Sequence, residues 1–294
     1  MLVTVVLWAS AFVAIRHLGH EVSAGALSLG RLLVASLVLG AFVLVRREAR
    51  PGANGSPAGM VGSGWPTGVG WVWLLICGVT WFGVYNVALN EAEQRVDAGT
   101  AAMLVNIGPI LIAVLAGLML GEGFPRRVLA GSAVAFAGVL VIGFSTAPGG
   151  DADMWGVALC VVAAVAYAIG VISQKPLLKD VSALRVTWLA CVVGTVACLP
   201  FTPALIRDLS AASPSTIGWV VYLGVMPTAL AFTTWAYALA RTSAGKTAAS
   251  TYLVPPVAIL LAWVLLGETP APLAFAGGGI CLLGVYLSRR VRAR

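Results

Sequence analysis

The sequence predicts an all-α polytopic membrane protein with ten transmembrane helices, which form two inverted five-helix repeats. Three observations lead to this prediction: the composition, the length of the apolar runs and an internal repeat. Hydrophobic residues make up 60% of the 294 residues, charged residues make up 10%, and the mean hydropathy is +0.97. Soluble domains carry about 25% charged residues, so we expect lipid to surround most of this chain.

Apolar runs of about 20 residues favour helices over a membrane barrel, because barrel strands alternate polar and apolar residues over about ten positions. The expected spans are 1–16, 25–45, 70–91, 98–120, 127–146, 154–174, 183–203, 215–238, 244–266 and 272–288. The first run is short for a bilayer, so either the chain continues upstream or this helix is partly sheltered. It has no basic region and no small-residue cleavage site, so we expect a first span and no removable signal peptide.

The basic residues predict the orientation of the spans, because cytoplasmic loops carry an excess of Lys and Arg. With a cytoplasmic N-terminus, the cytoplasmic side, including the Gly-, Pro- and Ser-rich loop 46–69, holds Arg46, Arg47, Arg50, Arg126, Arg127, Lys175, Lys179, Arg185, Arg241, Lys246, Arg289, Arg290, Arg292 and Arg294. The outer side holds only Arg16, Arg95 and Arg207. We therefore expect a multi-pass protein of the cytoplasmic (inner) membrane with both termini in the cytoplasm.

The two halves of the chain, 1–146 and 147–294, resemble each other. A shift of 146 residues superimposes 78–142 on 224–288 without a gap, and 17 of the 65 aligned positions are identical. The matched positions include Ala98-Gly99 with Ala244-Gly245, Pro109 with Pro255, Gly121-Glu122 with Gly267-Glu268, and Gly131 and Gly138 with Gly277 and Gly284. Each half has an odd number of expected spans, so the second half enters the membrane from the opposite side. Such inverted repeats favour alternating access to a midplane site, although some channels also use them.

Three segments resemble the EamA branch of the drug/metabolite transporter superfamily: WASAFVAIR at 8–16, NEAEQRVDAGTAAMLVNIGPILIAVLAGLMLGE at 90–122 and ARTSAGKTAASTYLVPPVAILLAWVLLGETP at 240–270. The likeness covers nearly the whole chain, and its specificity comes from the twice-repeated order of Ala-Gly, Pro and Gly-Glu. It departs from the family at the front, where little sequence precedes Trp8. The resemblance implies a ten-helix fold with both termini inside and, in most members, export of amino acids or other small metabolites.

Polar residues inside apolar spans are candidates for a substrate path, because polar side chains are costly in lipid. Asn86 and Asn90 are four residues apart on one face of the third span, and Tyr85 lies beside them. The alternative role for both asparagines is hydrogen bonding between helices. Aromatic residues expected to line the same cavity are Trp8, Tyr167 and Trp235.

Prolines mark the expected centre of the binding site. Asn106 lies one turn before Pro109, and its repeat mate Tyr252 lies just before Pro255 and Pro256. Each proline removes a backbone donor and frees a carbonyl at mid-depth, which must face protein, water or ligand. We predict that substrate contacts Asn106 and Tyr252 between the two halves; the alternative is that both prolines make structural kinks.

Charged residues in or near the spans divide into two groups. Glu122 and Glu268 follow glycine before the fifth and tenth spans, where we expect them to support folding by facing the positive end of the next helix. Arg31 lies within the second span and either attracts an anionic substrate group or snorkels to the outer surface. Glu91, at the outer end of the third span, is the nearest carboxylate to a candidate proton site, but with Glu93, Arg95 and Asp97 after it we expect Glu91 to be solvated.

The sequence offers little support for an enzyme or a metal site. The five cysteines, Cys77, Cys160, Cys191, Cys198 and Cys281, lie inside apolar runs without CxxC spacing, and His17 and His20 have no HExxH motif around them. We expect no cofactor and no metal, and the basic residues form no stripe that would favour nucleic acid.

The predicted function is that of a secondary transporter that exports small metabolites, with amino acids or similar amphipathic solutes favoured, by alternating access. Its expected partners are a small-molecule substrate and the lipid bilayer. The alternatives are an uncoupled facilitator or channel and, with less support, an intramembrane enzyme. Proton coupling and the oligomeric state stay open at this stage.

Overall fold

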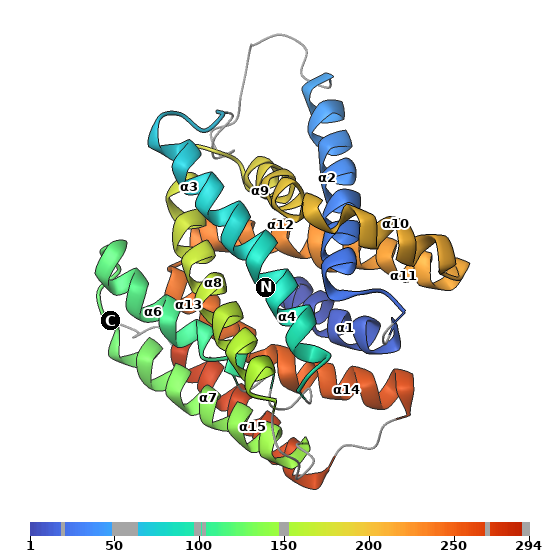
Figure 1. Cartoon of the computed structure of the whole chain (residues 1–294). Coiled ribbons are helices and arrows are strands. Elements are labelled where there is room, and N and C mark those ends of the chain that lie inside the picture. The colour runs from blue at the N-terminus through green and yellow to red at the C-terminus, as the bar shows by residue number, and fades with distance from the viewer. Residues whose placement is uncertain are drawn as a thin grey trace.

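The computed structural model describes residues 1–18, 21–48, 64–96, 101, 104–146, 153–267 and 271–289, and these residues contain helices and no β-strand. The α-helices are α1 (Leu2–Leu18), α2 (Ala24–Glu48), α3 (Val69–Cys77), α4 (Tyr85–Glu93), α6 (Gly108–Met119), α7 (Arg126–Thr146), α8 (Met154–Leu177), α9 (Ala183–Cys198), α10 (Thr202–Ala211), α11 (Pro214–Leu223), α12 (Ala231–Arg241), α13 (Ala244–Ala249), α14 (Val254–Leu266) and α15 (Pro272–Arg289). The π- or 3₁₀-helical segments are η1 (Gly78–Val84), η2 (Leu199–Phe201), η3 (Gly224–Leu230) and η4 (Ser250–Leu253). Together they form one helical bundle (Figure 1).

Seven continuous helical segments are long and apolar enough to cross a bilayer. They are Ala24–Val45, Val69–Glu93, Arg126–Phe144, Met154–Leu177, Ala183–Ala211, Pro214–Arg241 and Ala244–Leu265. Three further apolar helices are shorter: Leu2–Ile15, Gly108–Met119 and Pro272–Ser288. Length and composition therefore support seven spans in the described part of the chain, where ten were expected. The expected span 98–120 differs most, because α6 begins only after a turn at Asn106 and Ile107.

Two of the long spans contain π-helical segments, and η1 and η3 occupy the same positions under the 146-residue shift. A π-turn leaves backbone carbonyls without their usual α-helical partners. Side chains satisfy them here. Asn86 Nδ2 donates to the carbonyls of Trp81 at 3.2 Å and Phe82 at 2.9 Å, and Thr228 Oγ1 donates to the carbonyl of Leu223 at 2.8 Å. These bonds hold the side chains of Asn86 and Thr228 in one orientation toward the interior of the bundle.

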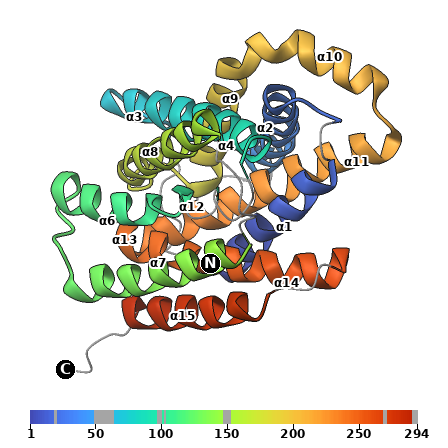
Figure 2. The same cartoon turned by 60° about the horizontal axis from the view of Figure 1, so that its bottom comes forward.

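Helices α7 and α15 lie side by side along one edge of the bundle (Figures 1 and 2). Glycines allow this contact. A Cβ atom on Gly131 would lie 2.6 Å from the carbonyl oxygen of Gly284, and one on Gly138 would lie 2.6 Å from that of Gly277. Glycine at these four positions therefore lets α7 and α15 approach closely, as contacts between membrane helices require.

Large apolar side chains cover the outside of the bundle. Leu37 is 73% exposed, Phe144 72% and Val264 76%, and each lies on one of the apolar helices. A soluble protein rarely leaves so much contiguous apolar surface in water, whereas lipid accommodates it. The chain is therefore a multi-pass membrane protein, as its composition predicts.

Candidate functional site

A cavity with a volume of about 90 Å³ lies at the centre of the bundle. Its lining residues are Trp8, Ala11, Phe12, Ile15, Arg31, Trp81, Tyr85, Asn86, Leu89, Glu93, Val105, Asn106, Pro109, Tyr167, Phe232, Thr251 and Val254. They come from α1, α2, α4, α6, α8, α12 and α14, from η1 and η4, and from the segment before α6. Since one water molecule needs about 10–15 Å³, the cavity can hold several waters or a small solute. A mainly apolar wall with a few polar tips is typical of a small-molecule site.

Aromatic rings close one end of the cavity. Trp8 lies 5.2 Å from Trp235, and Trp81 lies 5.3 Å from Tyr167 and 5.0 Å from Phe232, measured between ring centroids. Trp8 also donates through Nε1 to the carbonyl of Pro227 at 3.2 Å. This aromatic cluster (Trp8, Trp81, Tyr167, Phe232 and Trp235) joins helices from both halves of the chain, so any movement between the halves must repack it.

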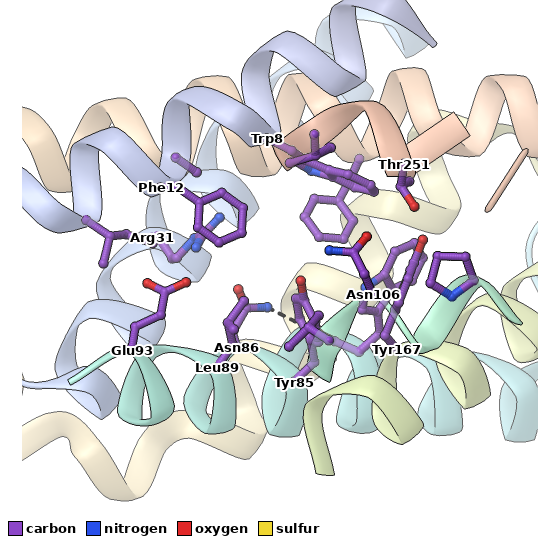
Figure 3. Close-up of a pocket in the computed structure, with 17 residues that line it drawn as sticks. Trp8, Phe12, Arg31, Tyr85, Asn86, Leu89, Glu93, Asn106, Tyr167 and Thr251 are labelled. Atoms are coloured by element: carbon purple, nitrogen blue, oxygen red, sulfur yellow. Dashed lines mark hydrogen bonds between the residues drawn. The ribbon is translucent and has the colours of Figure 1, made fainter. Parts of the chain in front are cut away.

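Asn86 and Asn106 carry polar groups on the cavity wall (Figure 3). The Asn86 amide nitrogen is used by the η1 carbonyls, so its Oδ1 atom is the group left to accept a bond from a ligand. Asn106 lies in the interruption just before α6, and Pro109 lines the cavity from the first turn of that helix. Two of the predicted polar contacts, and the predicted break at Pro109, therefore meet at one cavity.

Charges occupy the opposite end of the cavity (Figure 3). Arg31 lies on α2 and is only 6% exposed, and its Nε atom donates to Thr228 Oγ1 at 2.9 Å. Glu93 lies at the end of α4 with its Oε1 atom buried and without a hydrogen-bond partner among the described residues. Sequence reasoning did not single out Glu93 and named it only among the charges that follow Glu91. The signal was its spacing of seven residues from Asn86, which puts both on one face of a helix.

The other predicted site residues lie outside the cavity wall. Asn90 Nδ2 donates to Ser28 Oγ at 2.9 Å and so joins α4 to α2, which was the alternative role considered for it. Trp235 belongs to the aromatic cluster behind the wall.

Tyr252 is fully buried in a different cluster, with Ala135, Val139 and Cys281. Its neighbour Thr251 faces the cavity instead. Pro255 and Pro256 occupy the first turn of α14, directly after η4, so the predicted interruption is present although Tyr252 points away from the cavity. The expected contact between substrate and Tyr252 therefore has no geometric support.

Two charged side chains hold the junction of α12 and α13. Lys175 Nζ donates to the carbonyls of Leu239 and Thr242, both at 2.5 Å, at the C-terminal end of α12. Glu122 accepts from the N–H groups of Ala244 at 2.7 Å and Gly245 at 3.4 Å, at the start of α13. Both contacts place a charge where it complements a helix end. We call Lys175, Glu122 and these four backbone groups the α12–α13 clamp.

The role of Glu122 is thus partly as predicted. It faces a helix start, but α13 from the other half is its partner, rather than the next helix α7. Left-handed Gly121 and Gly123, both with φ of +67°, turn the chain so that Glu122 can reach across. Glu268, its repeat mate, lies outside the described residues.

Replacing Glu122 with Gln should lower the thermal stability of the purified protein while the surviving protein still transports. The amide keeps an acceptor but loses the charge that favours the start of α13, a loss of about 0.5–1 kcal/mol. A melting curve in detergent, paired with flux at equal amounts of folded protein, measures both effects. Unchanged stability with abolished transport would contradict this role.

Glu91, which the sequence predicts to be solvated, lies outside the cavity wall. Its Oε1 atom lies 2.7 Å from Arg95 Nη2, and Arg95 Nη1 lies 3.4 Å from Asp153 Oδ2. The hydrogen bond to Glu91 raises the pKa of Arg95, and the Trp155 N–H together with Arg95 lowers the pKa of Asp153. These exposed charges belong to the bundle surface.

Comparison with known proteins supplies the context for this cavity. The model of the EamA-like transporter family matches residues 1–144 and again 154–290. A protein of Streptantibioticus cattleyicolor named "probable terminal-alkyne amino-acid exporter" is 39% identical over 99% of this chain and 92% of its own length. A Salmonella typhimurium protein named "probable amino-acid metabolite efflux pump" is 27% identical over 70% of this chain and 72% of its own length.

A solved crystal structure has the same fold. It superposes with a TM-score of 0.74 on 98% of this chain and 94% of its own, at 19% sequence identity. At that identity the likeness concerns the fold alone.

Proposed function

Because the chain belongs to the EamA-like transporter family, we propose that it is a secondary transporter that exports amino acids or similar amphipathic metabolites by alternating access. The observation that carries the proposal is the central cavity, which combines aromatic walls with a buried Arg31, Glu93 and two asparagines. Ionisable residues inside membrane spans are rare and mark substrate or ion paths. The names of the two exporter-like relatives favour amino acids and outward flux.

Inverted repeats are part of this proposal, and contacts between α7 and α15 support them. Gly131 meets Gly284, and their repeat mates Gly277 and Gly138 meet each other in the same way. Cys281 Sγ donates to the carbonyl of Ala135 at 3.4 Å, and these two residues are themselves 146 positions apart. Exchange of partners between equivalent residues is what a twofold axis produces. The equivalent positions of η1 and η3 fit the same axis.

The proposed state of this structure is outward-facing. With the N-terminus in the cytoplasm, the charged end of the cavity lies toward the outside, near Ile15 and Glu93 at the ends of α1 and α4. The aromatic cluster and the α12–α13 clamp then lie between the cavity and the cytoplasm. Alternating access would require both to open while the outer end closes.

Orientation is testable with single cysteines, because all five native cysteines are buried. Ser56→Cys places a thiol in the loop 46–69, and Ser215→Cys places one at the exposed start of α11, on the opposite side in the proposed topology. A membrane-impermeant maleimide added to intact cells should label Ser215→Cys and reach Ser56→Cys only after permeabilisation. Ready labelling of Ser56→Cys from outside would overturn the topology and the inverted arrangement with it.

The function itself is tested by screening purified protein in liposomes against a panel of amino acids and nucleosides. We expect flux of one or more amino acids above protein-free liposomes, and none of nucleosides. An uncoupled facilitator is the second candidate function. Flux against a gradient that an uncoupler abolishes would support ion coupling, whereas flux that only follows the gradient would support the facilitator.

A further inference from the structure

We infer that Arg31 and Glu93 recognise the two charges of a zwitterionic α-amino acid, with Arg31 holding the carboxylate and Glu93 the ammonium group. This inference rests on the proposed function and names the substrate chemistry of its cavity. The two residues come from different helices, α2 and α4, and point toward one another across the charged end of the cavity (Figure 3).

Arg31 is prepared to bind a carboxylate. Its Nε atom is anchored to Thr228 Oγ1, which is itself held by the Leu223 carbonyl, so the guanidinium has a fixed orientation. Its terminal nitrogens make no hydrogen bond to the described residues, although the side chain is nine-tenths buried. A guanidinium presents two parallel N–H groups that match a carboxylate, so these nitrogens form a ready-made carboxylate site.

Glu93 and Asn86 provide the matching acceptors for an ammonium group. Glu93 Oε1 is buried and unpartnered among the described residues, and Asn86 presents only its oxygen because its nitrogen is bound to η1. An ammonium group has three donors and no acceptor, so two oxygen acceptors on one helix face suit it.

The gap between the two charges is the decisive geometry. Within the described part of the chain Arg31 and Glu93 form no direct ion pair, although both face the same cavity. Burial in a low-dielectric site disfavours the charged form of each side chain unless a ligand supplies a partner for it. A zwitterion supplies a carboxylate for Arg31 and an ammonium group for Glu93, and it adds no net charge. An amine without a carboxylate, or an acid without an ammonium group, leaves one of the two side chains unpaired. The aromatic end of the cavity then receives the apolar side chain.

The test uses L-propargylglycine, its decarboxylated analogue but-3-yn-1-amine and its deaminated analogue pent-4-ynoate, as competitors in liposomes that contain the full-length protein. For the parent protein we expect the amino acid to be preferred over each analogue by about 30-fold or more, the low end of the range for an unpaired buried charge. Arg31→Gln should no longer prefer the amino acid over the amine, because the carboxylate has lost its partner. Glu93→Gln should no longer prefer the amino acid over the acid, because the ammonium group has lost its partner. Glu91→Gln, two residues from Glu93 but facing the surface, is the matched control and should behave as the parent.

The two variants should change the ratio of inhibition by the amine to inhibition by the acid in opposite directions. This ratio does not depend on how much of each variant folds, so partial misfolding does not affect the test. Parent protein that moves the amino acid, with variants that keep the parent ratio, would overturn the recognition of charge by Arg31 and Glu93 and leave the proposed function standing. Parent protein that moves none of the amino acids of the panel would overturn both.

Discussion

An Ala11→Phe variant is expected to fold and yet to lose substrate binding and transport by more than about tenfold. Ala11 lies on α1 and lines the cavity, whose volume is only about 90 Å³. A phenyl ring at this position would fill space that the substrate needs, because the surrounding helices are close-packed and cannot expand without cost. The effect should grow through Ala11→Val, Ala11→Leu and Ala11→Phe, as the side chain takes more of the cavity.

Binding by calorimetry and flux in liposomes measure this series, with a melting curve for each variant. Val3→Phe is the control, because Val3 lies on the same helix and is 50% exposed on the outside of the bundle. A folded Ala11→Phe protein that binds and transports as the parent does would place the substrate path elsewhere.

Lys175→Met is expected to open the end of the bundle that the α12–α13 clamp closes. Lys175 donates two charge-assisted hydrogen bonds to carbonyls at the end of α12. Bonds of this kind contribute about 1.5–3 kcal/mol each when buried, and Lys175 is only half-buried, so we expect a total of about 2 kcal/mol. If this energy acts in the closed state alone, its loss shifts the equilibrium between the two states by about 30-fold.

The shift is measured by the labelling rate of a thiol at Ala236, which is fully buried between the aromatic cluster and the clamp. In an Ala236→Cys background, Lys175→Met should speed labelling by a water-soluble maleimide by about 10–100-fold. Lys179→Met makes the same chemical change at an exposed position just beyond α8 and should leave the rate unchanged. Equal labelling rates in the two variants would show that Lys175 does not hold this end of the bundle closed.

Much of the architecture could be predicted from the sequence, because lipid leaves few ways to satisfy a backbone. Apolar runs located the helices, and the glycines that the repeat matches lie at the close contact of α7 and α15. Prolines identified the interruptions before α6 and α14. Each of these signals is local, or depends on a repeat that the sequence itself contains.

The sequence did not predict side-chain positions that depend on local helix geometry or on a partner far away in the chain. Thr251 rather than Tyr252 faces the cavity, because η4 is a 3₁₀ segment with three residues per turn, which changes the face that each residue occupies. Glu122 reaches α13, and nothing local to Glu122 reveals which helix start lies opposite it. Glu93 was named only among the charges that follow Glu91, although helical spacing places it on the same helix face as Asn86.

Counterflow in liposomes tests the central claim, that one cavity is exposed to the two sides of the membrane in turn. Liposomes containing the protein are preloaded with unlabelled L-propargylglycine and diluted into a trace of labelled compound. For the parent protein we expect transient accumulation of label above its equilibrium level, because an alternating carrier exchanges one solute for another. For Ala11→Phe we expect no such accumulation. Entry of label that rises only to equilibrium, as through an open channel, would contradict this claim.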